Sequence, residues 1–212
     1  MKKLIYISFL LLGISIQSFG QAGEQHISKL ELRKKEKKIF QDRHRDSTSV
    51  LYIDTLIMKD RSSLQFFGKK NVKLVVKYAE IGDKAFISGV GGENNASNFD
   101  IDIHLQKLGS LYVIARGLDA MNGTKTYPNG DGGTVNFTYD SQGIMPQTAD
   151  KKAKNYVFID VSAGGRTINP TTDLNQIYSR IATAPSGLRG IPQGQIYSGS
   201  PGREGQANIN SK

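Results

Sequence analysis

Val72-Lys-Leu-Val-Val-Lys-Tyr-Ala-Glu-Ile-Gly82 and Phe99-Asp-Ile-Asp-Ile-His-Leu-Gln-Lys-Leu-Gly109 are two segments of similar pattern, and they decide the fold. In the second segment, large apolar residues alternate with Asp100, Asp102 and His104. A period of two is typical of a β-strand that has one face against the core and the other in solvent. The stretch 71–117 therefore predicts a β-sheet protein.

The same pattern, three alternating apolar residues followed by a glycine, occurs four times in the chain. Its first residues are Leu74, Ile101, Val135 and Val157, and its glycines are Gly82, Gly109, Gly143 and Gly165. Repeats at intervals of about 20 to 50 residues mark stacked units that bury their apolar rows against a neighbour. We therefore predict a mainly β fold, a short parallel β-helix (solenoid) with glycines at its corners and flexible flanking segments. An antiparallel β-sandwich is the alternative, because ordinary hairpin turns also use glycine.

The first 20 residues have the pattern of a secretory signal peptide. Met1-Lys-Lys3 is a short basic region, an apolar run follows to Ile16, and Ser18-Phe-Gly20 places small residues where a signal peptidase cleaves. The apolar run is too short for a spanning helix. We expect an exported protein of a Gram-negative cell, periplasmic or at the surface, with no transmembrane span after cleavage. The chain has no cysteine, so packing and backbone pairing must stabilise it without disulfides.

Composition divides the rest of the chain into a basic charged lead-in (21–48), a β domain (49–182) and a Gly-, Pro- and Ser-rich tail (183–212). The lead-in has only a thin apolar stripe, which predicts a solvated linker or a weakly amphipathic helix. Because the formal net charge is +9, its lysines could attach the protein to an anionic surface. The lysines assigned to this attachment are Lys34, Lys35, Lys37 and Lys38. Nucleic acid is not an expected partner, since the lead-in lacks interleaved aromatic residues.

The tail is predicted to be disordered, because its composition cannot bury enough apolar area to fold alone. We expect such a flexible segment to insert into a partner protein. We expect that deleting residues 183–212 abolishes partner capture and leaves the thermal stability unchanged.

Candidate ligand residues lie on the polar face of the second quoted segment. Asp100, Asp102 and His104 point to the same side, and the two carboxylates are expected to lie about 6.5 to 7 Å apart. That separation is at the lower edge of the range used by inverting glycosidases. The sequence contains no cysteine and none of the common nucleophile or phosphate-binding motifs, so no catalytic residue is assigned.

A second candidate site is the longest loop, from Gly117 to Gly133. Loops on a regular scaffold commonly carry binding residues. The oxygen donors of this loop are Asp119, Asn122, Asn129 and Asp131. Calcium is the cation that such donors would accept, although plain turns use the same residues. No other cofactor is expected.

Three features resemble the exported Gly-rich β-solenoid envelope proteins of Bacteroidetes-type bacteria. They are the signal peptide ending in Ser18-Phe-Gly-Gln21, the absence of cysteine, and the stretch Ile114-Ala-Arg-Gly-Leu-Asp-Ala-Met-Asn-Gly123 followed by Asp131-Gly-Gly-Thr-Val135. Parallel β-helices of this kind include polysaccharide lyases as well as adhesins and envelope proteins without catalytic activity. The resemblance implies an exported β-solenoid.

The function expected from these features is a non-enzymatic envelope or surface protein that acts by binding and assembly, such as an accessory subunit of an envelope complex. Its expected partner is an envelope protein or an anionic surface glycan. The alternative is a glycan-binding or glycan-active β-helix domain, which would need clustered carboxylates, or an Arg and a Lys, on one sheet face.

Overall fold

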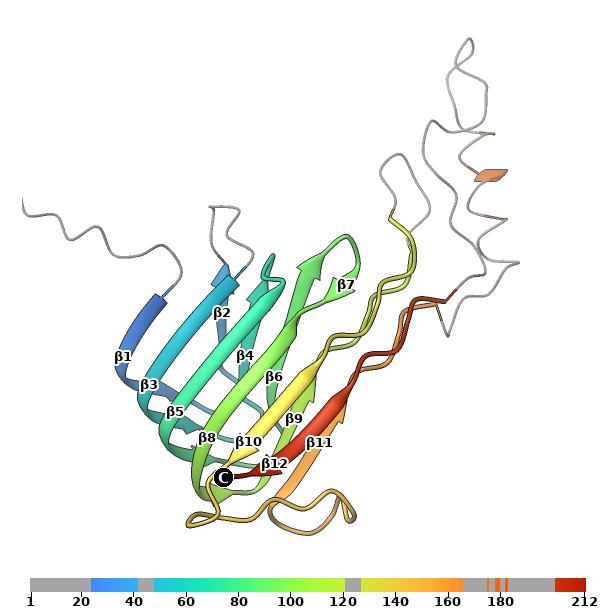
Figure 1. The fold of residues 1–212 in the computed structure, drawn as a ribbon. Coiled ribbons are helices and arrows are strands. Elements are labelled where there is room, and N and C mark those ends of the chain that lie inside the picture. Colours follow the sequence, from blue (N-terminus) through green and yellow to red (C-terminus); the bar gives the residue numbers. More distant parts are fainter. Residues whose placement is uncertain are drawn as a thin grey trace, which may run out of the picture.

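The protein is built from two parallel β-sheets that face each other (Figure 1). The computed structural model describes residues 24–41, 48–120, 127–165 and 201–212, together with four isolated helical residues, 175, 178, 179 and 182. Sheet A contains, in spatial order, β1 (Glu24–Leu32), β3 (Thr48–Met58), β5 (Asn71–Ile81), β8 (Asn98–Leu108), β10 (Val135–Tyr139) and β12 (Ala207–Ser211). Sheet B contains β11 (Tyr156–Asp160), β9 (Ser110–Ile114), β6 (Ala85–Gly92), β4 (Ser63–Phe67) and β2 (Lys37–Gln41), and the short β7 (Asn95–Ala96) pairs with β6.

The chain winds as a parallel solenoid. From β1 to β11 it passes alternately through sheet A and sheet B, with β7 as the exception, and every pair of neighbours along both sheets is parallel. Only the short hairpin between β6 and β7 is antiparallel. The predicted parallel β-helix is therefore confirmed, and the antiparallel sandwich is excluded.

The core consists of apolar rows that run across the strands. In sheet A, Leu51, Leu74, Ile101 and Phe137 are aligned by the strand register and are fully buried. In sheet B, Leu64, Ile87 and Val113 form the facing buried row. Each residue of a row therefore packs on the equivalent residue of the next coil, as predicted from the repeated apolar pattern.

The long strands of sheet A bend where two successive residues face outward. In β3 the outward pair is Asp54-Thr55, and in β5 it is Lys77-Tyr78. The bend shifts the register between β5 and β8, so that Ala79 rather than Tyr78 lies beside Leu105. The repeat pattern predicts that Tyr78, its third apolar residue after Leu74 and Val76, matches Leu105. This match is wrong, and Tyr78 is 41% exposed.

Two other alignments of the predicted repeat also differ. Val135 pairs with Phe99 instead of Ile101, a shift of two residues that keeps the same face inward. Val157 belongs to sheet B, where it pairs with Leu111. A period-two pattern cannot distinguish these registers or sheets, because each of them buries the same alternate residues.

The corners between sheet A and sheet B use few left-handed glycines. Left-handed backbone occurs there at Lys35, Arg61, Lys84 and Asn155 (φ 62°, 60°, 55° and 62°). Gly82 and Gly109 instead lie where an added Cβ would strike the neighbouring coil. These two glycines allow close stacking of the coils rather than supplying positive φ.

The charged lead-in is part of the solenoid. Residues 24–32 form β1 and residues 37–41 form β2, each paired in parallel with the next coil. The prediction of a solvated linker or helix was therefore wrong for these residues. Both strands lie at the edge of their sheet, where most side chains are exposed, and this position explains their polar composition.

The end of the predicted tail is also ordered. Residues 207–211 form β12, which pairs with β10 in register from Val135–Ala207 to Tyr139–Ser211. The prediction of a disordered tail was thus wrong for residues 201–212, and residues 183–200 lie outside the described part of the chain. The predicted signal peptide, residues 1–20, lies outside it as well.

Four segments that are not strands run alongside one another beyond the ends of β9, β10, β11 and β12 (Figure 1). We call residues 115–120, 127–134, 161–165 and 201–206 the glycine bundle. Backbone hydrogen bonds link its segments, among them Gly117 N–H to Ser162 O, Gly164 N–H to Gly130 O and Gly202 N–H to Gly164 O, at 2.9 to 3.1 Å. Close approach of four backbones explains why glycine recurs in these segments. Among the described residues, no helix has the length and apolar character needed to cross a membrane.

Candidate functional site

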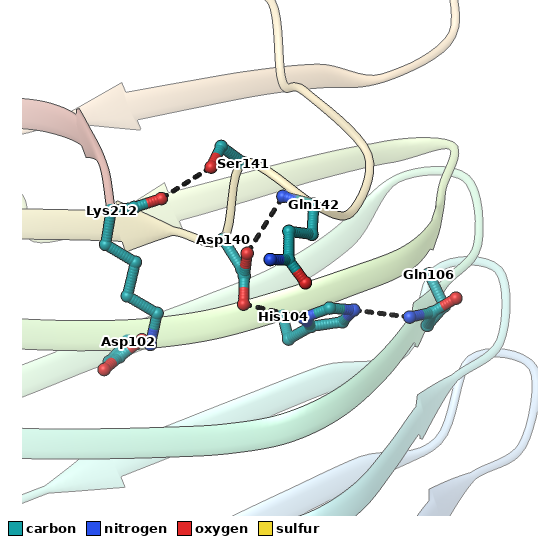
Figure 2. Close-up of polar contacts among 7 residues, drawn as sticks. All are labelled: Asp102, His104, Gln106, Asp140, Ser141, Gln142 and Lys212. Atoms are coloured by element: carbon teal, nitrogen blue, oxygen red, sulfur yellow. Dashed lines mark hydrogen bonds and ion pairs between the residues drawn. The ribbon is translucent and has the colours of Figure 1, made fainter.

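The predicted ligand residues lie on the outward face of β8, beside β10 and β12. Asp100 is exposed, and Asp102 forms an ion pair with Lys212, with 2.5 Å between the carboxylate and Nζ (Figure 2). The sequence placed Asp102 correctly on the polar face. It could not indicate Lys212, which follows β12 and is 110 residues away.

His104 is held between two polar partners. Its Nδ1 lies 3.0 Å from Oδ2 of Asp140, and its Nε2 contacts the side-chain amide of Gln106 (Figure 2). The backbone N–H of Gln142, together with the His104 ring, holds the pKa of the Asp140 carboxyl below its ordinary value. Asp140 is therefore ionised at neutral pH and orients the imidazole.

This polar cluster fastens the end of the chain to the sheet. The Ser141 hydroxyl and backbone N–H both donate to the carbonyl oxygen of Lys212, and Lys212 N–H donates to Tyr139 O. On the far side of His104 lies the Gln106 amide, which is not a nucleophile. The arrangement is that of a brace between β8, β10 and β12.

The predicted metal residues also brace the backbone. Oδ1 of Asp119 accepts a hydrogen bond from Gly165 N–H (2.6 Å), Oδ1 of Asn129 from Ala120 N–H (2.7 Å), and Oδ1 of Asp131 from Arg203 N–H (2.7 Å). These contacts join segments of the glycine bundle. Asn122 lies outside the described residues. Among the residues that the structure describes, no group of three His, Cys, Asp or Glu side chains could hold a metal ion.

The four predicted attachment lysines lie at one corner of the solenoid. Lys34 and Lys35 occupy the turn between β1 and β2, Lys37 and Lys38 begin β2, and all four are exposed. The same corner carries further exposed cations in the next coils, namely Lys59, Arg61, Lys84 and Lys107. Stacked coils thus extend the short basic run of the sequence into a corner where these cations outnumber the carboxylates of Glu36, Asp60 and Asp83.

The outward face of sheet B carries a row of aromatic side chains, of which Phe158 is exposed and Phe86 and Tyr112 are half-buried. Phe86, Tyr112 and Phe158 occupy one row across β6, β9 and β11. Phe86 and Tyr112 are stacked with ring centroids 5.2 Å apart, and Tyr112 lies 6.0 Å from Phe158. We call these three residues the aromatic ladder. Our sequence reasoning missed it, although each member directly precedes an inward aliphatic residue of its strand, as in Phe86-Ile87.

A groove of about 300 Å³ adjoins the aromatic ladder, where sheet B meets the glycine bundle. Its apolar wall includes Phe67 (40% exposed), Val90, Ile114 and Leu118 (45% exposed). Arg116 lies at the same groove, is exposed, and its guanidinium has no hydrogen bond or ion pair within the described residues. The groove therefore combines apolar surface with the unpaired guanidinium of Arg116, and Asp119 also lines it.

Comparisons with protein-family models, with curated proteins and with solved structures found no match.

Proposed function

We propose that this protein is a non-enzymatic assembly subunit of the cell envelope, which binds a partner protein through the outward face of sheet B. The observation that carries the proposal is the contiguous apolar surface formed by the aromatic ladder and the adjoining groove. Extended apolar patches on a protein surface, bordered by polar residues, often mark interaction sites. The secretory pattern of residues 1–20 supports a place beyond the inner membrane.

The geometry of the ladder favours a protein surface over a ligand that stacks on single rings. The planes of Phe86 and Tyr112 differ by only 26°, so the two rings turn their faces to each other. The edges of these two rings and the aliphatic side chains of the adjoining groove remain available for contact with a partner protein. Aromatic side chains in such arrangements are typical of the centre of protein interfaces.

Arg116 indicates the chemistry of the partner. An unpaired guanidinium beside apolar surface gains most from a carboxylate, which it can bind through two parallel hydrogen bonds. The partner is expected to place a large apolar side chain in the groove, next to an Asp or Glu that meets Arg116.

Capture of the tagged protein's partner from envelope extracts of its own organism tests the proposal. Phe158→Glu introduces a charge on the ladder and should reduce retention of the partner at least tenfold, about 1.4 kcal/mol of binding free energy. Tyr78→Glu is the matched control, because Phe158 and Tyr78 are both 41% exposed and Tyr78 lies on sheet A. Retention should be unchanged by the control substitution.

The captured protein is then purified and titrated against both variants by calorimetry. Equal affinity for wild type, Phe158→Glu and Tyr78→Glu would place the interface elsewhere and overturn the proposal. A partner that binds Arg116→Glu as tightly as wild type would contradict only the proposed carboxylate.

A further inference from the structure

A second groove lies between the β6–β7 hairpin and the glycine bundle. It measures about 930 Å³ and is open to solvent. Its lining includes Lys70, Glu93, Asn95, Asn98, Tyr127 and Asp131. Unlike the groove beside the aromatic ladder, this groove is lined mainly by polar side chains, so it suits a ligand rich in hydrogen-bonding groups.

The hairpin that forms one wall is strained. Glu93 and Asn94 are consecutive residues with left-handed backbone (φ 52° and 67°), as in a tight two-residue hairpin connection. Glutamate is a poor residue for this conformation, which costs roughly 1 kcal/mol or more outside glycine, asparagine and aspartate. A strained backbone conformation of this kind persists only where contacts with the surrounding structure hold it in place.

The strained hairpin fixes the opposite wall. The side-chain amide of Asn94 donates to the carbonyl oxygens of Tyr127 (3.2 Å) and Pro128 (2.9 Å), and the backbone carbonyl of Asn94 accepts from Leu118 N–H (2.8 Å). Asn94 thereby sets the position of the segment that carries Tyr127. The groove is preorganised by contacts between parts of the chain that lie 24 to 34 positions apart.

The polar groups of the groove retain hydrogen-bonding capacity. Oδ1 of Asn95 accepts from Asp131 N–H (2.8 Å), and Oδ1 of Asp131 accepts from Arg203 N–H, which leaves the amide N–H groups of Asn95 and the second oxygen of Asp131. The side chains of Lys70 and Glu93 have no recorded partner in the described part of the chain. The groove therefore offers both donors and acceptors to a ligand.

Tyr127 supplies an open aromatic face. Its ring is 49% exposed and has no ring partner among the described residues, whereas Tyr112 is stacked on Phe86. The C–H face of a pyranose packs on such a ring, while amides and carboxylates bind its adjacent hydroxyls. Lys70, Glu93 and Asp131 together carry a small negative net charge, which disfavours an anionic polymer.

We propose that this groove binds a neutral oligosaccharide, which stacks one sugar ring on Tyr127 and donates and accepts hydrogen bonds at Asn95, Asp131, Glu93 and Lys70. The site shares no residue with the aromatic ladder or its groove, so it is independent of the proposed protein interface.

Calorimetric titration with cellohexaose, maltohexaose and mannohexaose tests this inference on the full chain. At least one of these probes should bind with a Kd of about 1 mM or tighter. Tyr127→Ala should weaken that binding at least tenfold, and Tyr78→Ala, at an exposed tyrosine on sheet A, should not change it. Asn94→Gly keeps the left-handed turn but removes the bonds to Tyr127 and Pro128, so it should weaken binding without changing the far-ultraviolet circular dichroism.

Two results would overturn the inference. One is the absence of binding by all three neutral probes at about 10 mM. The other is tighter binding of polygalacturonate than of any neutral probe, with an affinity that Tyr127→Ala leaves unchanged. Neither result affects the capture experiment on Phe158, because the two sites are separate.

Discussion

Replacing Gly130 by alanine is expected to lower the free energy of unfolding by roughly 3 to 5 kcal/mol. Gly130 is buried in the glycine bundle, and a Cβ built there would overlap the backbone carbonyl of Asn94. Gly130 is not among the glycines with positive φ, so the cost comes from the overlap and not from backbone conformation. A backbone carbonyl cannot move aside as a flexible side chain can, and relief requires displacement of a whole segment.

Thermal unfolding followed by circular dichroism measures this effect. A loss of 3 to 5 kcal/mol corresponds to a fall in Tm of about 6 to 20 °C for a domain of this size. Gly68→Ala is the control, because Gly68 has positive φ (73°) but open space around its Cβ position. The control should cost only about 1 kcal/mol. A Gly130 variant as stable as the Gly68 variant would show that the segments are not in close contact.

Deletion of residues 207–212 is expected to destabilise the protein by roughly 2 to 4 kcal/mol. Removing β12 opens the edge of β10, where Val135 and Phe137 are fully buried, and removes the contacts of Lys212 with Asp102, Tyr139 and Ser141. This expected loss of stability is the opposite of what the composition of the tail predicted, namely that deleting residues 183–212 leaves the thermal stability unchanged. Urea unfolding of the two proteins measures the difference.

Lys212→Ala provides the control for the deletion. It removes the ion pair to Asp102 and keeps the backbone contacts of the strand, so it should change stability by less than about 1 kcal/mol. If the deleted protein unfolds at the same urea concentration as wild type, β12 does not pack on β10.

Most strands could be predicted from the sequence, because inward and outward residues alternate along them. The edge strand β1 escaped detection because the bend in sheet A breaks that alternation. Ile27, Leu30 and Leu32 follow a spacing of three and then two, which looks like an irregular helical stripe. The buried residues Ile53, Leu56 and Met58 of β3 have the same spacing. A search for this bent pattern, rather than strict alternation, would have identified β1.

The return of the C-terminal strand could not be predicted from local composition. β12 is short, and its stability comes from β10, whose residues lie 72 positions earlier in the chain. The composition of the glycine-rich residues before it predicts disorder. In the glycine bundle they instead permit backbone contacts with distant segments.

Candidate side chains could be predicted from the sequence, but their partners could not. His104 lies on the polar face of its strand as expected, yet its role depends on Asp140, which follows a different strand. The aromatic ladder likewise forms only when β6, β9 and β11 align. Parallel coils bring together residues that are 23 or more positions apart, and such spacing carries no local signal.

The central claim is that the chain forms parallel coils to which the C-terminal strand returns in register. The absence of cysteine allows a direct test with the double variant Asn136→Cys/Asn208→Cys. These residues are register partners, and the Asn208 amide lies 2.9 Å from Oδ1 of Asn136. Neighbouring strands are about 4.8 Å apart, within the Cα separation that a disulfide can bridge.

For this double variant we predict complete intramolecular cross-linking under mild oxidation, identified by mass spectrometry of the linked peptides. The pair Asn136→Cys/Ile209→Cys, with side chains on opposite faces, should remain reduced. Equal cross-linking of both pairs, or none in either, would contradict the parallel register on which the proposed surfaces depend.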